Sequence, residues 1–311
     1  MGNANCGSTL LTTLLGRHSQ IATVGELKMT AVPADPNYLC GCGEKLVDCA
    51  FWKEVRSIIR RQGGDLRFED FATHYRSGKE LASKLAGTPV RGPFFELLRS
   101  AAFRCLPSAS GHLRRVTQRN LEIMAAVCAT EGKSAFLDGS KDPARLLNFV
   151  RSGMFDLRAI HLVRDGRAIV ASYRKRQAHI GDCLYGWKTK ALECENLKRR
   201  IGPRSILTVR YEDLCSDPEA ALRSIFQFAD IEDESLRCLT LAEGGSVHII
   251  GHASRLSNAK EIRLREEWRE LLTPAELESF GMIEDDLNSR YHYPTTPLIP
   301  VHSRKREASI S

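Results

Sequence analysis

The first nine residues have the types and spacing to bind a phosphate group. Gly2 and Gly7 are separated by four residues, and Ser8 and Thr9 then open an apolar helical pattern. Small residues let backbone N–H groups converge on an anion, and the positive end of a helix dipole adds to the attraction. This spacing is that of a Walker A loop, but Ser8 stands where that loop has lysine. We therefore predict that residues 2–9, called the cradle below, bind a phosphate.

A kinase or ATPase remains a less favoured alternative for this cradle. Such enzymes use the missing lysine to hold the β- and γ-phosphates and to offset charge as the phosphoryl group transfers. The sequence also shows no clear acidic residue of the Walker B type after an apolar strand. The cradle therefore suits a phosphate that is not itself transferred.

A short apolar run over residues 21–24 predicts a strand that ends at Gly25 and Glu26. Strand ends beside a helix N-terminus are where open α/β sheets place their chemistry. Glu26 is therefore a candidate general base, although a solvated loop glutamate is an equally good interpretation of the pattern alone.

A second anion site is predicted after the apolar strand over residues 157–163. The strand closes on Arg164-Asp165-Gly166-Arg167, and the helix that follows carries Ser172 and Arg176. Residues four positions apart share a helix face, so this hydroxyl and guanidinium could hold one phosphate between them. The alternative is that the Arg-Asp turn pairs with itself.

Three clustered cysteines are the only unusual feature among the ten in the chain. Cys40, Cys42 and Cys49 lie within ten residues, whereas most of the others stand alone in apolar surroundings. A structural zinc site needs four ligands, and no fourth ligand with ordinary spacing follows. A tight loop without metal is therefore expected, with a metal or disulfide role as the minor alternative.

The order of the elements predicts an α/β fold of the three-layer P-loop type, with a central, mostly parallel sheet flanked by helices. Apolar strands alternate with helical patterns, and this alternation requires right-handed crossovers between parallel strands. We expect a single domain over residues 1–293, a helical insertion over about 51–130, and a disordered tail over 294–311, which is rich in Pro, Ser and Thr.

Composition favours a protein with an anionic partner. The 311 residues carry a formal net charge of +7. The basic residues are dispersed and few aromatics lie among them, which argues against nucleic acid. No window approaches the roughly 18 apolar residues of a membrane span, so a soluble, cytoplasmic protein is expected. The oligomeric state stays open.

Taken in order, the motifs resemble the sulfotransferases that use 3′-phosphoadenosine 5′-phosphosulfate (PAPS). The likeness is to the bacterial carbohydrate-type branch that is similar to the tyrosylprotein enzymes, and it runs from about Gly2 to Trp268. It is carried by CGSTLL, IATVGEL, CGCG with a following Phe-Trp, SKDP, HLVRDGRAIVAS, and RYEDL with DPE. It implies sulfuryl transfer from PAPS to a hydroxyl on a carbohydrate, a tyrosyl group or a small molecule, with no metal required.

The resemblance also implies roles for individual residues. Glu26 would activate the acceptor, and Lys141 would approach the sulfuryl group. The Gly7-Ser8-Thr9 turn would hold the 5′-phosphosulfate, while Arg164 and Ser172 would bind the 3′-phosphate. The residues expected to contact the donor are Asn5, Cys6, Gly7, Ser8, Thr9, Arg164, Ser172, Arg176, Tyr211 and Arg255.

Two departures from the family pattern predict weaker catalysis. Asn5 stands where the family has Arg or Lys, and the strand that should precede the cradle has no room before Met1. A missing central strand would leave apolar faces and backbone groups uncovered. We therefore expect a chain less stable and less active than its relatives, and a catalytically impaired nucleotide-binding homologue is the alternative function.

Overall fold

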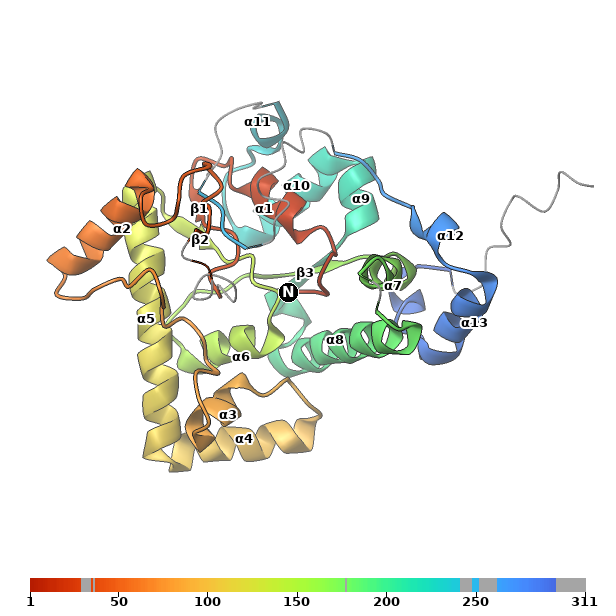
Figure 1. Cartoon of the computed structure of the whole chain (residues 1–311), viewed down its shortest axis with the longest axis horizontal. Coiled ribbons are helices and arrows are strands. Elements are labelled where there is room, and N and C mark those ends of the chain that lie inside the picture. Colours follow the sequence, from red (N-terminus) through yellow and green to blue (C-terminus); the bar gives the residue numbers. More distant parts are fainter. Residues whose placement is uncertain (29–34, 36, 177, 241–247, 252–261, 295–311) are drawn as a thin grey trace, which may run out of the picture.

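The computed structural model describes residues 1–28, 35, 37–176, 178–240, 248–251 and 262–294 (Figure 1). Arg255 and the predicted tail beyond residue 294 lie outside this part of the chain. All statements below concern the described residues.

Four short parallel strands form the centre of the fold. β1 (Ile21–Thr23) pairs with β2 (Ala135–Leu137), and β3 (Ala159–Val163) pairs with β4 (Ile206–Arg210). The predicted α/β class with parallel strands is confirmed. Among the described residues, however, the strands form two separate two-stranded sheets and not one continuous sheet.

A cavity of about 910 Å³ lies between the two sheets. Its walls include Phe136 of β2, Ile160 of β3 and Met124 from a neighbouring helix, so much of the lining is apolar. Met1 lies at its edge, where its amino group donates to Ile160 O at 2.5 Å and its carbonyl accepts from Leu162 N at 3.0 Å. The backbone of Met1 therefore continues the pairing of β3 on the edge away from β4.

Helices surround both sheets (Figure 1). Residues 50–131 carry four of them: α2 packs near one end of the long helix α5, and α3 and α4 pack near its other end. Helices α7 and α8 pack together beyond β3, and α9 and α10 follow β4. The bounds are α1 Ser8–Leu15, α2 Ala50–Arg61, α3 Leu81–Gly87, α4 Pro93–Cys105, α5 Pro107–Glu131, α6 Pro143–Ser152, α7 Gly166–Arg174, α8 Ile180–Ile201, η2 Pro203–Ser205, α9 Tyr211–Ser216, α10 Pro218–Ala229, α11 Ser235–Thr240, α12 Trp268–Leu271, α13 Pro274–Ile283 and η4 Ser289–Tyr291.

Two large apolar clusters form the core. One is built on α2 and α5 and contains the fully buried Trp52, and the other packs α1, α7, α8 and α10 around Phe226 and Phe280. The amphipathic pattern of each helix determines which face it buries. No described helix combines the length and the apolar content that crossing a bilayer would require.

Candidate functional site

The cradle bends sharply into α1, as the sequence predicted. Gly7 is the N-cap of α1 with a φ of +94°, and Asn5 is left-handed as well, with a φ of +62°. A Cβ at Gly7 would lie 2.4 Å from Cδ2 of Tyr211, so this position needs glycine for space as well as for backbone conformation. No side chain caps α1 at its N-terminus. The first turn of the helix therefore keeps its capacity to bind an anion.

Arg164 and Tyr211 form one wall of the cradle. The Arg164 guanidinium lies 4.4 Å from the centroid of the Tyr211 ring and donates to Asn5 O at 3.0 Å. Its other terminal nitrogen donates to Arg265 O at 2.8 Å, and the Tyr211 hydroxyl donates to Arg263 O at 3.0 Å. Four of the predicted site residues are thus brought together: Asn5 and Gly7 near the N-terminus, Arg164 after β3, and Tyr211 at the start of α9.

Two buried donors of the cradle have no acceptor within the described residues. They are Nδ2 of Asn5 and Nε of Arg164. A buried N–H group without a partner costs free energy, typically about 1–3 kcal/mol. A cationic side chain, an amide N–H and a helix N-terminus that lie close together are groups that bind an anionic part of a ligand.

The second predicted anion site, at Ser172 and Arg176, does not lie on one continuous helix. Ser172 lies in α7, but α7 ends at Arg174, and the N–H of Arg176 donates to Tyr173 O beyond the last turn. The helix from which a shared face of Ser172 and Arg176 was inferred therefore ends before Arg176. The sequence analysis missed Tyr173: burial raises the pKa of its hydroxyl, and the nearby Ala4 backbone of the cradle opposes that shift.

The Arg-Asp-Gly-Arg turn divides into two roles. Asp165 accepts from the Arg167 N–H at 2.9 Å and pairs with its guanidinium at 2.6 Å, and both side chains are buried. Arg167 also lies 4.2 Å from the Trp268 ring centroid. The self-pairing alternative is thus correct for Asp165 and Arg167, while Arg164 is left to the cradle.

The two predicted catalytic residues meet in an ion pair. Lys141 Nζ contacts Glu26 Oε1, and both side chains are partly exposed, at 15% and 28%. The backbone of Glu26 is held in place because its N–H donates a hydrogen bond to Ile250 O at 3.2 Å. Lys141 and Ser8 of the cradle line the same cavity. The pair therefore lies next to the cradle, as two strand-end residues should.

A set of backbone contacts holds the Glu26 segment against the turn that carries Lys141. Gly139 N donates to Gly25 O at 2.7 Å, and Lys28 N donates to Ser140 Oγ at 3.0 Å. The Lys28 ammonium also lies 2.7 Å from a carboxylate oxygen of Asp142. These contacts fix the segments on both sides of the ion pair.

A buried network that the sequence did not reveal supports this turn. Asp138 pairs with Arg145 at 2.8 Å, and Arg145 also donates to Asn120 Oδ1 at 2.5 Å and to Thr73 O at 2.9 Å. Burial alone would raise the pKa of Asp138, but the Arg145 charge and hydrogen bonds from Ser140 lower it below 3.8. Asp138 and Arg145 are therefore positioning residues.

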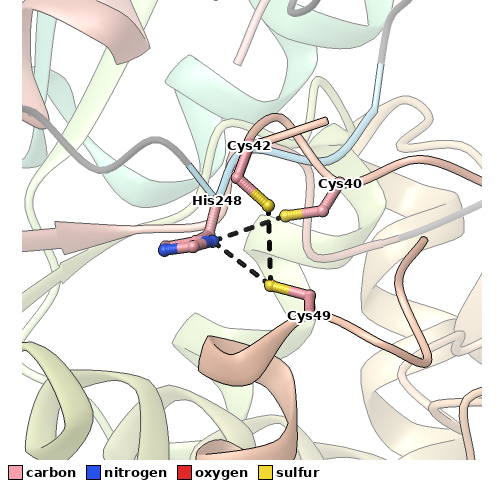
Figure 2. A group of neighbouring side chains, drawn as sticks. All are labelled: Cys40, Cys42, Cys49 and His248. Atoms are coloured by element: carbon pink, nitrogen blue, oxygen red, sulfur yellow. Dashed lines mark hydrogen bonds between the residues drawn. The ribbon is translucent and has the colours of Figure 1, made fainter. Parts of the chain in front are cut away.

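The structure brings a fourth potential ligand to the three clustered cysteines, although none follows them at ordinary spacing. His248 joins Cys40, Cys42 and Cys49, and the four ligand atoms all lie within 4.8 Å of one another (Figure 2). No local spacing rule could have found this histidine, because it lies 199 positions after Cys49.

Comparison with known proteins identifies the architecture. A family model described as "Sulfotransferase family" matches residues 92–235. The chain superimposes on the sulfotransferase domain of the Synechococcus PCC 7002 olefin synthase with a TM-score of 0.55, at 20% identity over 94% of this chain and 93% of that one. The fold is that of the sulfotransferases, and residues 92–235 match the model of that family.

A second solved structure agrees with this fold. The sulfotransferase domain of the curacin biosynthetic pathway matches with a TM-score of 0.50, at 14% identity over 94% of this chain and 96% of that one. No curated protein is a match for the sequence. The cradle, β1 and Glu26 lie outside the family-matched segment, whereas Lys141, Arg164 and Tyr211 lie inside it.

Replacing Gly7 with alanine tests the geometry of the cradle. The left-handed backbone and the contact with Tyr211 should lower the free energy of unfolding by about 1–3 kcal/mol. Gly111 is the matched control, because it lies in α5 with no atom within 4 Å of an added Cβ. Gly111→Ala should raise stability by roughly 0.5–1 kcal/mol. Urea unfolding of both variants gives the comparison, and equal effects would contradict the proposed strain at Gly7.

Arg145→Met tests the network behind the Lys141 turn. It leaves the Asp138 carboxylate buried without its partner, so the free energy of unfolding should fall by about 3–5 kcal/mol near pH 7. Arg223→Met is the control, since Arg223 pairs with Glu219 and Asp233 on the surface and its loss should change the free energy of unfolding far less.

The same variant should also change the dependence of stability on pH. In the wild type the folded pKa of Asp138 lies below its ordinary value of 3.8, so its stabilising contribution is present above that pH and is lost as pH falls through the folded pKa. The difference between wild type and Arg145→Met should therefore shrink below about pH 4. A difference that stays constant through this range would show that Asp138 is not the titrating partner.

Proposed function

We propose that this protein transfers a sulfuryl group from PAPS to a hydroxyl-bearing acceptor. The observation that carries the proposal is the meeting of two sites, a cradle with anion-binding donors and a carboxylate–ammonium pair beside it. The sulfotransferase fold and the family match support this chemistry over other uses of a phosphate cradle.

The cradle residues fit the two anionic ends of the donor. The backbone from Gly7 to Thr9 at the start of α1 would face the 5′-phosphosulfate, and Arg164 would face the 3′-phosphate. Ser172 and Arg176 remain proposed contacts of the 3′-phosphate, and Tyr211 supports Arg164 through its ring. Arg255 keeps its proposed role as a late contact, although it lies outside the described residues.

Glu26 and Lys141 would carry the reaction. PAPS supplies a sulfuryl group bonded to a phosphate leaving group. Glu26 would take the proton as the acceptor O–H bond breaks and the new O–S bond forms. The electron pair of the breaking S–O bond stays on the departing phosphate, where the Lys141 ammonium and cradle N–H groups stabilise the charge.

A catalytically impaired homologue is the second candidate. It is favoured by Asn5, because the family that this sequence resembles has Arg or Lys at this position. Here the side chain is uncharged, and the backbone carbonyl accepts a hydrogen bond from Arg164. The separation of the strands into two sheets favours it too. In that case the cradle would bind nucleotide, and transfer would be slow or absent.

Calorimetry with 3′-phosphoadenosine 5′-phosphate (PAP) and AMP tests the donor. PAP should bind at least about tenfold more tightly than AMP, because a charged hydrogen bond is worth about 1.5–3 kcal/mol. Arg164→Ala should remove most of that preference, whereas Arg61→Ala, an exposed arginine of α2 paired with Glu54, should leave it unchanged. Equal affinity for the two nucleotides would contradict a PAPS site, and magnesium-dependent ATP turnover would favour the kinase alternative.

Glu26→Gln tests the general base. It should lower kcat by roughly 10²–10⁴-fold while PAP affinity stays within about twofold, because the amide cannot accept the proton. Glu54→Gln, on the surface of α2, is the matched control. Transfer of labelled sulfate to a panel of sugar, phenol and small-molecule hydroxyls measures kcat. Unchanged transfer by Glu26→Gln would exclude this role, and no transfer by a wild type that binds PAP would establish the impaired homologue.

A further inference from the structure

We propose that Cys40, Cys42, Cys49 and His248 form a structural zinc site. Figure 2 shows the three sulfur atoms and Nδ1 of His248 directed at a common centre, with the other ring nitrogen pointing away. Three thiols and an imidazole are the donor set that selects Zn²⁺, a borderline-soft cation that prefers tetrahedral geometry.

Three of the six distances between the ligand atoms match a tetrahedral site, and the four atoms all lie within 4.8 Å of one another. With Zn–S near 2.3 Å and Zn–N near 2.0–2.1 Å, two sulfurs should lie about 3.8 Å apart, and a sulfur and a nitrogen about 3.5 Å apart. The Cys42 and Cys49 sulfurs are separated by 3.7 Å, and His248 Nδ1 lies 3.6 Å from the Cys40 sulfur and 3.4 Å from that of Cys49. These are separations of ligands around a cation, whereas a disulfide would need about 2.05 Å.

Local structure holds each ligand in place. Cys40 and Cys42 lie on a tight turn in which Gly43 N donates to Cys40 O at 2.9 Å, with a φ of +92° at Gly43. Cys49 is the N-cap of α2. The His248 ring stacks on Phe51, with centroids 4.3 Å apart and planes 2° from parallel. Three separate segments thus bring their donors to one point.

The site is closed, which makes its role structural. The protein supplies all four ligands, so no coordination position is left for a water or a substrate. Cys40 and Cys49 are buried, His248 is half-buried and Cys42 is exposed. The cation would be screened from solvent on most sides.

The metal would fix the strand beside Glu26. Next to His248, Ile249 O accepts from Gly41 N at 3.0 Å, and Ile250 bonds both Val24 and Glu26 through its backbone. The Tyr38 hydroxyl accepts from Gly251 N at 2.7 Å. A cation at His248 therefore links the cysteine turn, the start of α2 and the segment that holds the proposed general base.

Metal analysis of the full chain tests the proposal. Protein purified without a histidine tag should contain about one zinc per chain, as expected for four protein ligands. Cys42→Ser removes the exposed ligand with little effect on the core and should reduce bound zinc to below about a tenth per chain. Cys105→Ser, an exposed cysteine at the end of α4, is the matched control and should keep its zinc.

Two further measurements stand even if Cys42→Ser folds poorly. Cobalt(II) exchanged into the wild type should show thiolate-to-metal charge-transfer absorption with tetrahedral ligand-field bands. Stripping the metal should speed hydrogen exchange in peptides that cover residues 24–27 and 38–42. The inference would be overturned by metal-free protein whose three thiols react freely, by a Cys42–Cys49 disulfide in peptide mapping, or by full zinc occupancy in Cys42→Ser. None of these outcomes depends on sulfuryl transfer.

Discussion

The buried ion pair between Asp138 and Arg145 is the interaction on which the geometry of the site depends. Arg145 reaches from α6 to α5 and to the loop at Thr73, so one guanidinium holds three segments together. Asp138 lies directly after β2, and the two residues that follow it bond the Glu26 segment. Because a buried charge without a partner is costly, the pair can adopt few alternative arrangements. Lys141 therefore meets Glu26 in a defined place.

Positive charge in this protein is divided between structure and binding. Arg145 pairs with the carboxylate of Asp138, and Arg167 pairs with that of Asp165, so both arginines stabilise the fold. Arg164, only three residues before Arg167, bonds only backbone carbonyls and keeps its charge uncompensated by any described carboxylate within bonding distance. An uncompensated guanidinium beside a helix N-terminus is what an anionic ligand requires. The donor contact proposed for Arg164 rests on this difference between neighbouring arginines.

Local signals in the sequence were sufficient for the elements. The four strands are short apolar runs closed by polar residues, and α1 begins at Ser8 because Gly7 can adopt a left-handed backbone. The sequence was less informative about the residue at which a helix ends. Nothing in the spacing of Ser172 and Arg176 shows that α7 ends at Arg174, so the sequence could not place Arg176 beyond the end of the helix. The sequence also could not predict how many strands each sheet contains, because strand pairing depends on segments that are distant in the chain.

By itself the sequence determined the α/β class and the turn of the cradle into α1, and it predicted which residues could bind an anion or move a proton, because these follow from residue type and local periodicity. Only the tertiary structure decided which of them meet. Glu26 reaches Lys141 across 115 positions, and His248 completes a four-ligand cluster 199 positions after Cys49. Such contacts depend on how helices and strands pack, since a ligand set or an ion pair is defined by distance in space and not by spacing along the chain.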